Sequence, residues 1–523
     1  MFKTKSYIFN LVYSLFTLLA YNSIFLKKVY EITASGLFTC GAAICAFLLL
    51  NAACLLLFHP KTVKPLSISL LMLNTLTFYF MYTYNTEVDK IMLLNVLKTD
   101  VYEVHDLLSL KLAAFIIVLG LIPSFLIYKT QIIFSSYKIR GISLLLSVLI
   151  IASIILGGYS AAKPFLKNHK NIKYSLIPVN YIGAIISVAK VKLKRKPPLI
   201  KISDDAVLKP YWNNGKKNLI VFVMGETARA ANFSLNGYHR PTNRPLEKHG
   251  KELIYFHDFT ACGTSTAVSL PCVFSNSNRK SFKTGSEEYT ENVLDILNHA
   301  GYKVLWRENN TGCYNVCDRI EVEVPCREKH CLDEVMLQSF EEKVQKHNKN
   351  TFVVLHQRGS HGPAYHEHYP ESSELYTPVC TTQSLGECSQ ESLINVYDNS
   401  IHYTSAFLSM IIEKLQNLSK EYNTVLIYAS DHGESLGEDG RFLHAAPYDT
   451  APAYQKDIPF FVWMPDDTAQ ALNIDTNCLK NKIRNPYSHD NIYHSVLGLS
   501  GIETSTYDAE ADIFSSCQKR ANN

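Results

Sequence analysis

The sequence carries little net charge and no repeats, and these absences exclude several classes of protein. Its 523 residues have a formal charge of +4 at neutral pH, and 19% of them are charged. A nucleic-acid-binding chain usually shows a strong basic excess, which is missing here. No internal repeat and no low-complexity tract occurs along the chain. The length itself allows two or three domains.

Charged residues are scarce up to residue 161, where long apolar runs alternate with short polar loops. Each run approaches the roughly 20 residues that a helix needs to cross a bilayer. We therefore expect a transmembrane domain over 1–161 that consists of five helices. Asn10, Asn22, Asn51 and Asn74 interrupt the runs, and we expect them to bond to neighbouring helices. The runs cover about 8–25, 36–58, 66–84, 111–128 and 141–161.

The distribution of Lys and Arg predicts the orientation of these helices. The N-terminus and the loops near residues 62 and 135 are basic, whereas the 85–110 loop is rich in Asp and Glu. By the positive-inside rule, the N-terminus lies in the cytoplasm and the chain after residue 161 lies outside it. Lys27 and Lys28 argue weakly for the opposite orientation. The first run lacks a convincing cleavage site, so we expect an anchor rather than a removed signal peptide.

No cysteine occurs between residues 55 and 261, and none of the cysteine pairs has CxxC spacing. Cys40, Cys45 and Cys54 lie in the second apolar run, where we expect free thiols. The remaining cysteines form close pairs, which favours local disulfides in an oxidising compartment over a zinc-thiolate cluster. Cys478 and Cys517 are a weaker fifth candidate. The four expected bridges are Cys262–Cys272, Cys313–Cys317, Cys326–Cys331 and Cys380–Cys388.

A connector over 162–215 separates the apolar half from the rest of the chain. Its apolar stretch passes into a basic cluster that Pro197 and Pro198 end. We expect a periplasmic interfacial connector that lies on an anionic leaflet, and a solvated basic linker is the alternative. The basic residues are Lys190, Lys192, Lys194, Arg195 and Lys196.

From 216 to 523, short apolar runs alternate with amphipathic segments. The runs are rich in β-branched and aromatic residues, as buried parallel strands are. The alternation predicts a periplasmic α/β domain with a doubly wound, mostly parallel sheet. The runs are NLIVFVMG, KVLWRE, TFVVLHQ, TVLIYAS and IPFFVWM. The amphipathic segments include ENVLDILNHAG, CLDEVMLQSFEEKVQKH and the long segment over 392–420.

Side chains that can bind metals follow three of these strands. In an α/β sheet, ligand sites lie beyond the carboxyl ends of the strands. Glu226 follows the first run, His356 lies near the end of the third, and Asp431 and His432 follow the fourth. Zinc accepts carboxylate and imidazole ligands, and three protein ligands leave the open position that catalysis requires. Glu226, Asp431 and His432 are therefore the predicted zinc ligands.

Two further histidines are expected near the same edge of the sheet. His361 follows the third run, and a glycine-containing loop brings back His444. They are candidates for a second metal site or for contacts to an anionic substrate group. A single histidine is more often structural than a ligand, and the coincidence at one sheet edge is what favours a site.

The stretch CGTSTAVSLPC, 262–272, offers small hydroxyl residues between two cysteines. Such residues can open a helix, where free N–H groups and the macrodipole favour an anion. A bound divalent zinc lowers the pKa of an oxygen ligand by several units and so makes a threonine hydroxyl a usable nucleophile. A disulfide between the flanking cysteines would clamp this loop against the metal. An ordinary helix cap is the alternative.

Five ordered motifs together resemble the lipid A phosphoethanolamine transferases, a family of the alkaline-phosphatase-like superfamily that includes the mobile colistin-resistance enzymes. The motifs are GETARAANFSLNGY, CGTSTAVSLPC, LWRENN, HQRGSHGPAY and SDHGESLGEDGRFLH. The resemblance covers nearly the whole chain. It implies a multi-pass protein of the bacterial inner membrane whose catalytic domain lies in the periplasm.

The resemblance also implies substrates and partners. Phosphatidylethanolamine is the donor, lipid A is the acceptor, and membrane lipids surround the enzyme. The product carries an added ethanolamine cation, which lowers the negative surface charge and weakens the binding of polymyxins such as colistin. We expect no nucleic-acid partner and a monomeric protein.

The resemblance further assigns roles to individual residues in a ping-pong transfer. Thr266 is the nucleophile and a zinc ligand together with Glu226, Asp431 and His432, and one or two zinc ions are expected. His361 and His444 bind the second zinc or the phosphate, and His356 and Asn310 contact the substrate. In the loop over 91–108, Asn95 and Glu103 are candidate donor-lipid contacts, with an ordinary amphipathic interfacial helix as the alternative.

One position departs from the family. Tyr314 stands where a lysine is expected. A tyrosine donates a hydrogen bond but brings no positive charge, so recognition of the phosphate there would need a cation from elsewhere.

Several rival functions share parts of this pattern. The nearest are a phosphoglycerol transferase of the lipoteichoic-acid-synthase type and phosphoethanolamine transfer to another periplasmic glycan. A simple sulfatase or phosphatase would not need five membrane spans. Outside the enzymes, an inactive receptor for lipid headgroups is an alternative, which the intact Glu226, Thr266, Asp431 and His432 argue against.

Overall fold

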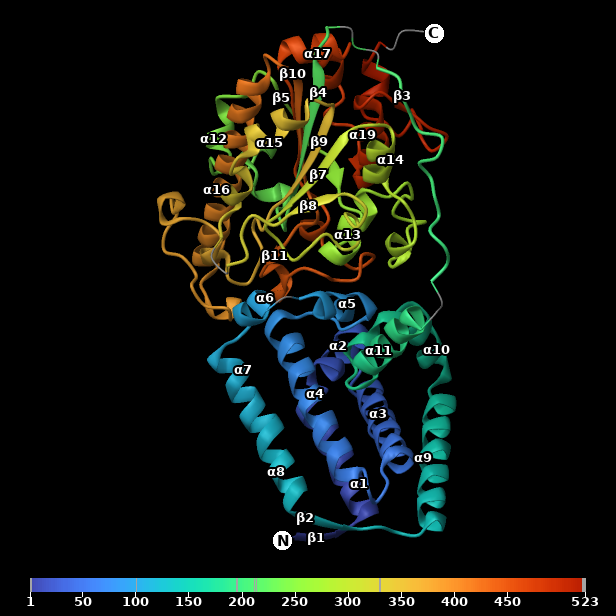
Figure 1. Cartoon of the computed structure of the whole chain (residues 1–523). Coiled ribbons are helices and arrows are strands. Elements are labelled where there is room, and N and C mark those ends of the chain that lie inside the picture. The colour runs from blue at the N-terminus through green and yellow to red at the C-terminus, as the bar shows by residue number, and fades with distance from the viewer. Residues whose placement is uncertain are drawn as a thin grey trace. The chain divides into compact units, whose positions relative to one another are not determined.

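The computed structural model of the chain divides into two compact units (Figure 1). It describes residues 2–99, 101–193, 196–210, 212, 214–328 and 331–519. The first unit comprises Met1–Leu93 and Leu108–Lys190, and the second comprises Leu94–Leu107 and Val191–Asn523. The domain boundaries expected near residues 161 and 215 stay predictions.

The first unit is built from long apolar helices close to the positions that the sequence predicts, except that the first run, expected over about 8–25, is broken at Asn22. Among the described residues, four helical segments are long and apolar enough to span a membrane. A fifth span results if α1 and α2, which are bent by 64°, act as one. The count of five therefore stays a prediction. The segments are α1 Ser6–Tyr21, α2 Ser23–Thr33, α3 Gly36–Leu57, α4 Val63–Tyr84, Leu110–Lys129 (α7, η1 and α8) and α9 Tyr137–Gly157.

Buried asparagines in this unit bond to neighbouring segments, as expected of polar side chains inside a bundle. Asn22, at the break between α1 and α2, donates to the carbonyl of Ile177 and accepts from its amide. Asn74 accepts from the Tyr181 hydroxyl at 2.9 Å. Asn51 Oδ1, by contrast, receives no hydrogen bond from the part of the chain that is described.

Shorter elements fill the outer loop and the connector. The loop forms α5 Lys90–Lys98 and α6 Val101–Asp106, and the connector forms α10 Tyr159–Asn168, η2 Lys170–Ser175 and α11 Val179–Lys192. Two members of the predicted basic cluster, Lys194 and Arg195, lie outside the described residues. Lys196 pairs with Glu288 at 2.6 Å within the second unit, so this charge contacts protein.

The second unit is organised around a seven-stranded sheet of the described residues, in the order β5-β13-β10-β4-β9-β7-β8. Neighbours from β10 to β8 run parallel, whereas β13 is antiparallel to both β10 and β5. The parallel direction expected for IPFFVWM was therefore wrong. The strand β13 is buried along its whole length, and an apolar run of this kind carries no information about direction.

The strands are β4 Lys217–Gly225, β5 Leu253–Phe256, β7 Lys303–Glu308, β8 Glu321–Glu323, β9 Thr351–His356, β10 Tyr422–Ser430 and β13 Phe460–Trp463. The short strands β5 and β8 at the two edges were not predicted. Neither is long enough to show a strong pattern, which is usual for edge strands.

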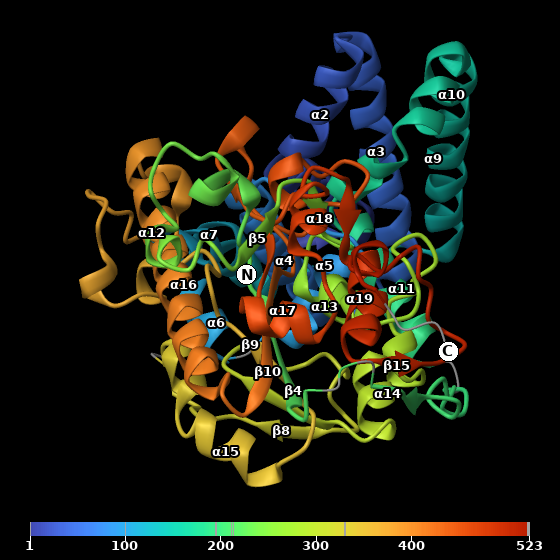
Figure 2. The same cartoon turned by 90° about the horizontal axis from the view of Figure 1, so that it is seen from above.

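Helices cover both faces of this sheet (Figures 1 and 2). Alternate residues of β4 enter different cores: Phe222 packs with α13, α14 and α19, and Val221 packs with α12, α15 and α16. Because both faces are covered, the strand reads as a continuous apolar run. The helices are α12 Arg244–Glu247, α13 Thr266–Val273, α14 Val293–His299, α15 Phe340–His347, α16 Gln390–Leu418, α17 Asp466–Ala471, α18 Thr476–Lys480 and α19 Ile492–Leu499.

Short pairs of strands outside the main sheet connect loops in both units. In the first unit β1 Phe2–Lys5 pairs with β2 Thr130–Ile133. In the second unit β3 Val207–Leu208 pairs with β15 Ile502–Glu503, β6 Phe259–Thr260 with β14 Tyr487–Ser488, and β11 Ser435–Leu436 with β12 Phe442–Leu443.

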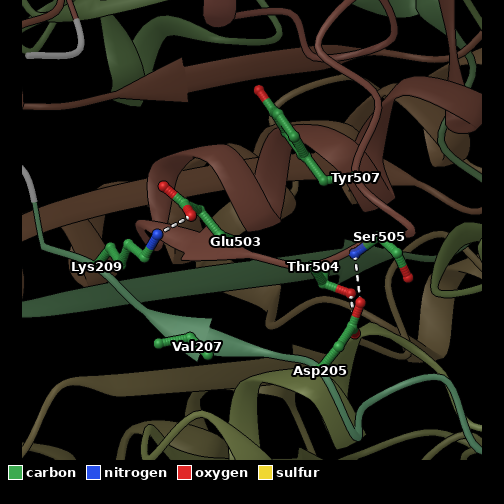
Figure 3. Close-up of a pocket in the computed structure, with 7 residues that line it drawn as sticks. All are labelled: Asp205, Val207, Lys209, Glu503, Thr504, Ser505 and Tyr507. Carbon is green, nitrogen blue, oxygen red and sulfur yellow. Dashed lines mark hydrogen bonds and ion pairs between the residues drawn. The ribbon is translucent and has the colours of Figure 1, made fainter. Parts of the chain in front are cut away.

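A cavity of about 490 Å³ lies beside the β3–β15 ladder (Figure 3). Its polar groups bond to one another: Lys209 pairs with Glu503, and Asp205 accepts from the Thr504 hydroxyl and the Ser505 amide, each at 2.7 Å. These bonds attach the end of the connector to the second unit.

Five disulfides join the cysteines of the described second unit, in the pairs expected from the sequence. They include the weaker candidate, Cys478–Cys517. Cys40, Cys45 and Cys54 are free thiols. The other bridges are Cys262–Cys272, Cys313–Cys317, Cys326–Cys331 and Cys380–Cys388.

This pairing predicts the thiol count of the protein. Denatured but unreduced protein should take up three equivalents of an alkylating reagent, and reduced protein should take up thirteen. Intact-mass spectrometry measures both numbers. An uptake of more than three equivalents before reduction would mean that at least one of the bridges is absent.

Candidate metal centre and active site

In the register of the sheet, the carboxyl ends of β4, β7, β9 and β10 lie side by side. Gly225 of β4 pairs with Ser430 of β10, and Met224 of β4 pairs with His356 of β9. His356 in turn pairs with Glu308, the last residue of β7. Because these strands are parallel, the residues that follow them meet at one edge of the sheet. This is the edge at which the sequence predicts the site.

Glu226, Asp431 and His432 form a compact cluster at this edge. Their ligand atoms all lie within 4.8 Å of one another, and all three side chains are buried. His432 Nε2 is 3.2 Å from Asp431 Oδ2 and 3.5 Å from Glu226 Oε1. Its other nitrogen, Nδ1, donates to the Gly433 carbonyl at 2.9 Å. Since a carbonyl only accepts, Nε2 presents its lone pair to the two carboxylates.

The cluster gathers hydrogen-bond acceptors, and this chemistry fits a cation. Asp431 Oδ2 is buried and receives no geometrically sound hydrogen bond from any described residue. Burial raises the pKa of Asp431, and burial together with the charge of His444 lowers the pKa of His432. A buried set of acceptors is unfavourable alone. A divalent metal would satisfy all of them, and zinc accepts this donor set.

Thr266, the predicted nucleophile, is the first residue of α13 and lies against this cluster. Its Oγ1 is 3.2 Å from each carboxylate oxygen of Glu226 and 3.4 Å from His432 Nε2. The helix begins here as the sequence predicts, with Ser265 at its N-cap. The structure therefore brings the predicted nucleophile and the predicted ligands together from three separate segments.

The turn after Glu226 is held in a strained conformation. Thr227 has φ +52°, which a β-branched residue rarely adopts. Two bonds hold it: its amide donates to Asp431 Oδ1 at 3.1 Å, and its carbonyl accepts from Tyr397 of α16 at 2.7 Å. Strain of this kind persists only where the surroundings over-determine it, and it is concentrated at functional sites. Here it turns Glu226 into the cluster.

His361 and His444 also come to this edge. The ring centroid of His444 is 4.3 Å from that of His432 and 5.8 Å from that of His361. His444 Nδ1 lies 3.4 Å from a carboxylate oxygen of Glu434, a buried residue that sequence reasoning missed within the motif SDHGESLG. Burial and the charge of His444 lower the pKa of His361 to about 3. His361 is thus a neutral ring that can ligate a cation or donate a hydrogen bond to an anionic group.

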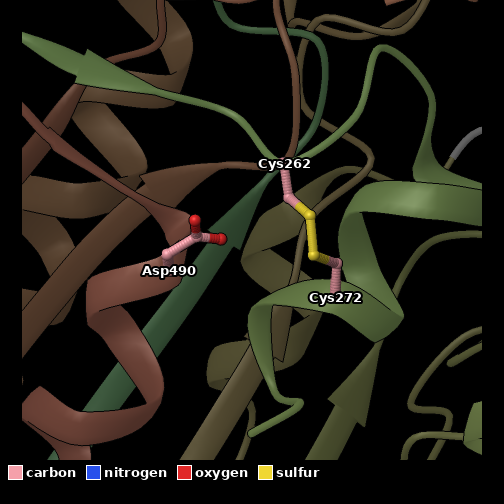
Figure 4. Close-up of side chains that lie close together, drawn as sticks. All are labelled: Cys262, Cys272 and Asp490. Carbon is pink, nitrogen blue, oxygen red and sulfur yellow. A yellow bond between two sulfur atoms is a disulfide. The ribbon is translucent and has the colours of Figure 1, made fainter. Parts of the chain in front are cut away.

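The loop that carries Thr266 is fixed on both sides. The Cys262–Cys272 disulfide closes it (Figure 4), and Thr264 exchanges hydrogen bonds of 2.7 and 2.6 Å with residues 445 and 446 just after His444. Asp490 lies beside the disulfide in Figure 4. Because the two sulfur atoms are bonded to each other, this group of three does not offer thiolates to a metal.

His356 and Asn310 form a buried set with Glu308. Asn310 donates to Glu226 Oε2 at 2.8 Å and lies 3.2 Å from His356 Nε2. His356 Nδ1 is 2.9 Å from Glu308 Oε1. Burial opposes protonation of His356, but the charge and hydrogen bond of Glu308 outweigh it and raise the pKa. Sequence reasoning overlooked Glu308, although it ends a predicted strand at the same edge.

The position that departs from the family is next to this set. The Tyr314 hydroxyl is 3.3 Å from Thr311 Oγ1. Lys98 Nζ lies 5.5 Å from the centre of the Tyr314 ring, within the range of a cation–π interaction. Asn95 is half-buried on α5, and the side chain of Glu103 lies outside the described residues. The lipid-contact role of both residues stays a prediction.

The loop after β9 packs against the backbone of Glu226. Asp333 accepts from the amides of Arg358 and Gly359 at 2.9 and 3.1 Å, and the Ser360 amide donates to the Glu226 carbonyl at 3.1 Å. Gly359 has φ +54°, and a Cβ there would lie 2.8 Å from the carbonyl oxygen of Glu226. A side chain at this position would displace the predicted ligand.

Comparison with known proteins gives two family matches. The family described as Sulfatase matches residues 218–502, and the family described as Phosphoethanolamine transferase EptA/EptB matches residues 46–193. Together they span most of both units.

Curated relatives and a solved structure agree with these matches. The chain is 35% identical to phosphoethanolamine transferase EptA of Escherichia coli K12, with 87% of this chain and 86% of the relative aligned. It is 35% identical to phosphatidylethanolamine transferase Mcr-1 of Escherichia coli over 77% of this chain and 79% of the relative. The integral membrane protein EptA of Neisseria meningitidis matches with a TM-score of 0.95 and 34% identity, over 99% of this chain and 100% of that one.

The packing of Gly359 gives a test of the metal centre. Gly359→Ala should lower the metal content of the purified protein, measured by elemental analysis, because the added methyl group pushes Glu226 out of the cluster. Gly301→Ala is the matched control, since Gly301 also has positive φ but has open space around its Cβ position. The control should lose roughly 1–2 kcal/mol of stability, because alanine is strained at positive φ, and it should keep its metal. Equal metal content in both variants would contradict the assignment of Glu226.

Proposed function

The chain belongs to the phosphoethanolamine transferase family, and from this premise we propose that it works through a covalent phosphoethanolamine–threonine intermediate. The donor is phosphatidylethanolamine, the acceptor is a phosphate of lipid A, and the enzyme is a zinc-dependent protein of the inner membrane. The observation that carries the proposal is the Thr266 hydroxyl, 3.2 Å from both carboxylate oxygens of Glu226 and 3.4 Å from His432 Nε2.

In the first half-reaction Thr266 Oγ1 attacks the phosphorus of the donor. The new bond joins the threonine oxygen to phosphorus, and the bond from phosphorus to the diacylglycerol oxygen breaks. The hydroxyl proton moves to Glu226, the nearest acceptor, and the leaving alkoxide takes a proton from His444, whose side chain is 16% exposed. A zinc ion held by Glu226, Thr266, Asp431 and His432 would lower the pKa of the threonine hydroxyl.

In the second half-reaction an oxygen of the lipid A phosphate attacks the same phosphorus. The bond to Thr266 Oγ1 breaks, and the threonine takes its proton back from Glu226. His444 regains a proton from the hydrogen phosphate form of the acceptor, so the enzyme returns to its starting state. The product phosphate carries an ethanolamine cation, so the membrane surface binds cationic polymyxins less tightly. This change in charge is the proposed basis of colistin resistance.

The donor phosphate needs partners that hold it near Thr266. The first-turn amides of α13 are suitable donors. The side-chain amide of Asn310 donates to Glu226 and to the Gln357 carbonyl, and it would exchange one of these bonds for the phosphate. His361 and His444 would bind the phosphate or a second zinc ion, since His444 lies beside His432 and His361 lies beside His444. Lys98, over the ring of Tyr314, would supply the positive charge that Tyr314 lacks.

Replacement of the nucleophile tests the proposal directly. Thr266→Ala should abolish release of diacylglycerol from a fluorescent phosphatidylethanolamine, because no oxygen remains to attack the phosphorus. Thr266→Ser keeps the hydroxyl and should retain activity. Intact-mass spectrometry should find the added phosphoethanolamine on the wild type and not on the alanine variant. Undiminished turnover by Thr266→Ala would remove this residue from the mechanism.

The acceptor is identified by expressing the wild type and Thr266→Ala in cells. Mass spectrometry of lipid A should show added phosphoethanolamine with the wild type and none with Thr266→Ala. If donor cleavage occurs but lipid A is unmodified, the phosphoethanolamine goes to another periplasmic glycan. If the transferred group is glycerol phosphate instead, the enzyme is of the lipoteichoic-acid-synthase type.

The charge of Lys98 gives a second test. Lys98→Gln should raise the KM for phosphatidylethanolamine several-fold with little change in kcat, because it removes a cation from the phosphate side of the site. Lys251→Gln, an exposed lysine of the same unit that precedes β5, is the control and should leave both constants unchanged. If the two variants behave alike, Lys98 does not replace the missing lysine.

A further inference from the structure

His489 is a buried histidine that bridges two segments of the active site. It is 1% exposed and lies in the short 3-10 turn η12, His489–Asn491. Its Nε2 is 2.9 Å from the carbonyl oxygen of Ser430, and its Nδ1 is 3.0 Å from the amide nitrogen of Cys262. The carbonyl accepts and the amide donates, so the ring carries its proton on Nε2 and accepts at Nδ1.

Both nitrogens of the ring are therefore used, and the ring is neutral. Burial lowers the pKa of His489 to about 3. A neutral imidazole that donates one hydrogen bond and accepts another holds its two partners at a fixed separation. A change of tautomer or of charge would break at least one of the two bonds.

The two segments that His489 joins are the ones that must meet for the reaction. Ser430 is the last residue of β10 and precedes Asp431 and His432, two of the predicted metal ligands. Cys262 opens the loop that leads to Thr266 and is bonded to Cys272 at the other end of that loop. The histidine thus fixes the base of the nucleophile loop to the end of the strand that carries the ligands.

The turn that carries His489 is itself firmly held. Ser488 and Asn491 form a capping box around it. The neighbouring Asp490 accepts from the Arg279 amide at 2.7 Å and lies beside the Cys262–Cys272 disulfide (Figure 4). The ring of His489 meets Phe259 edge to face, with centroids 6.1 Å apart. These contacts hold the His489 ring in place, so the ring would not move with the segment of Ser430 or with that of Cys262.

We propose that His489 is a positioning residue that sets the distance between Thr266 and the metal ligands. The proposal rests on the transfer through Thr266 described above and goes beyond it, because both hydrogen bonds of His489 go to backbone groups. Thr266 Oγ1 lies only 3.2 Å from Glu226, and a shift of about 1 Å in a reacting group can cost about 100-fold in rate.

Three replacements of His489 test its two hydrogen bonds one at a time. An asparagine amide can reach the position of Nδ1, so His489→Asn keeps an acceptor for the Cys262 amide. A glutamine amide reaches the position of Nε2, so His489→Gln keeps a donor for the Ser430 carbonyl. His489→Phe fills the space and offers neither. All three are made in the full-length protein, which is purified in detergent.

The readouts are kcat and KM for fluorescent phosphatidylethanolamine, zinc content and thermal unfolding. His489→Phe should lower kcat about 10- to 100-fold, with KM and zinc content within two-fold of the wild type. His489→Asn should restore most of the lost kcat, because the bond to Cys262 holds the nucleophile loop, and His489→Gln should restore less. If His489 only stabilised the fold, variants of equal thermal stability would not differ in kcat in this order.

His494→Phe is the matched control. His494 lies five residues further on in α19, and its Nδ1 accepts from the Asp508 amide at 3.1 Å, away from the nucleophile loop. It should lower the unfolding temperature without a change in kcat. Wild-type kcat in His489→Phe, or equal kcat in the phenylalanine and asparagine variants, would overturn the proposal. If His489→Phe does not fold, the order of asparagine above glutamine decides the question.

Failure of this proposal is distinguishable from failure of the proposed function. Thr266→Ala is measured in the same assay, and an active alanine variant would refute the covalent intermediate. An inactive Thr266→Ala beside a fully active His489→Phe would refute only the positioning role.

Discussion

The mutual repulsion of buried acceptors is the constraint on which the rest of the site depends. Glu226, Asp431 and the lone pair of His432 Nε2 lie within 4.8 Å of one another, with the Thr266 hydroxyl as their neighbour. Such a group is stable only when a cation neutralises it or when the surrounding fold holds it in place. The surrounding structure supplies the second condition: a sheet register, a strained turn at Thr227, and a glycine where no side chain fits.

Much of this site follows from the sequence because the rule that locates it is simple. The carboxyl ends of parallel strands meet at one edge of a sheet, so Glu226, Asp431 and His432 are found from two apolar runs and the residues that follow them. The same rule points to Glu308 at the end of β7, which was not predicted although the rule applies to it equally. The direction of β13 could not be found in this way, since a strand buried on both faces reads the same in either direction.

His489 could not be predicted, for a different reason. The ring acts through hydrogen bonds to two backbone groups, a carbonyl at 430 and an amide at 262, and backbone groups leave no signature in a sequence. Its own segment carries only a capping pattern, Ser488 to Asn491, which is common at helix starts. The contact between Lys98 and Tyr314 is equally hidden, because more than two hundred residues separate the two side chains.

A phosphate-binding cation and the nucleophile differ in how freely their position in the sequence can vary. A phosphate is recognised by charge, which acts over several ångströms, so a lysine that reaches the site from another segment can replace one that is missing at residue 314. In the proposed reaction the placement of Thr266 has no such freedom, since its oxygen would attack phosphorus in one half-reaction and leave it in the next from the same position. The fold accordingly fixes the nucleophile loop by a disulfide and a doubly bonded histidine. The cation proposed for the phosphate side, Lys98, lies over the face of the Tyr314 ring and interacts electrostatically with Glu287.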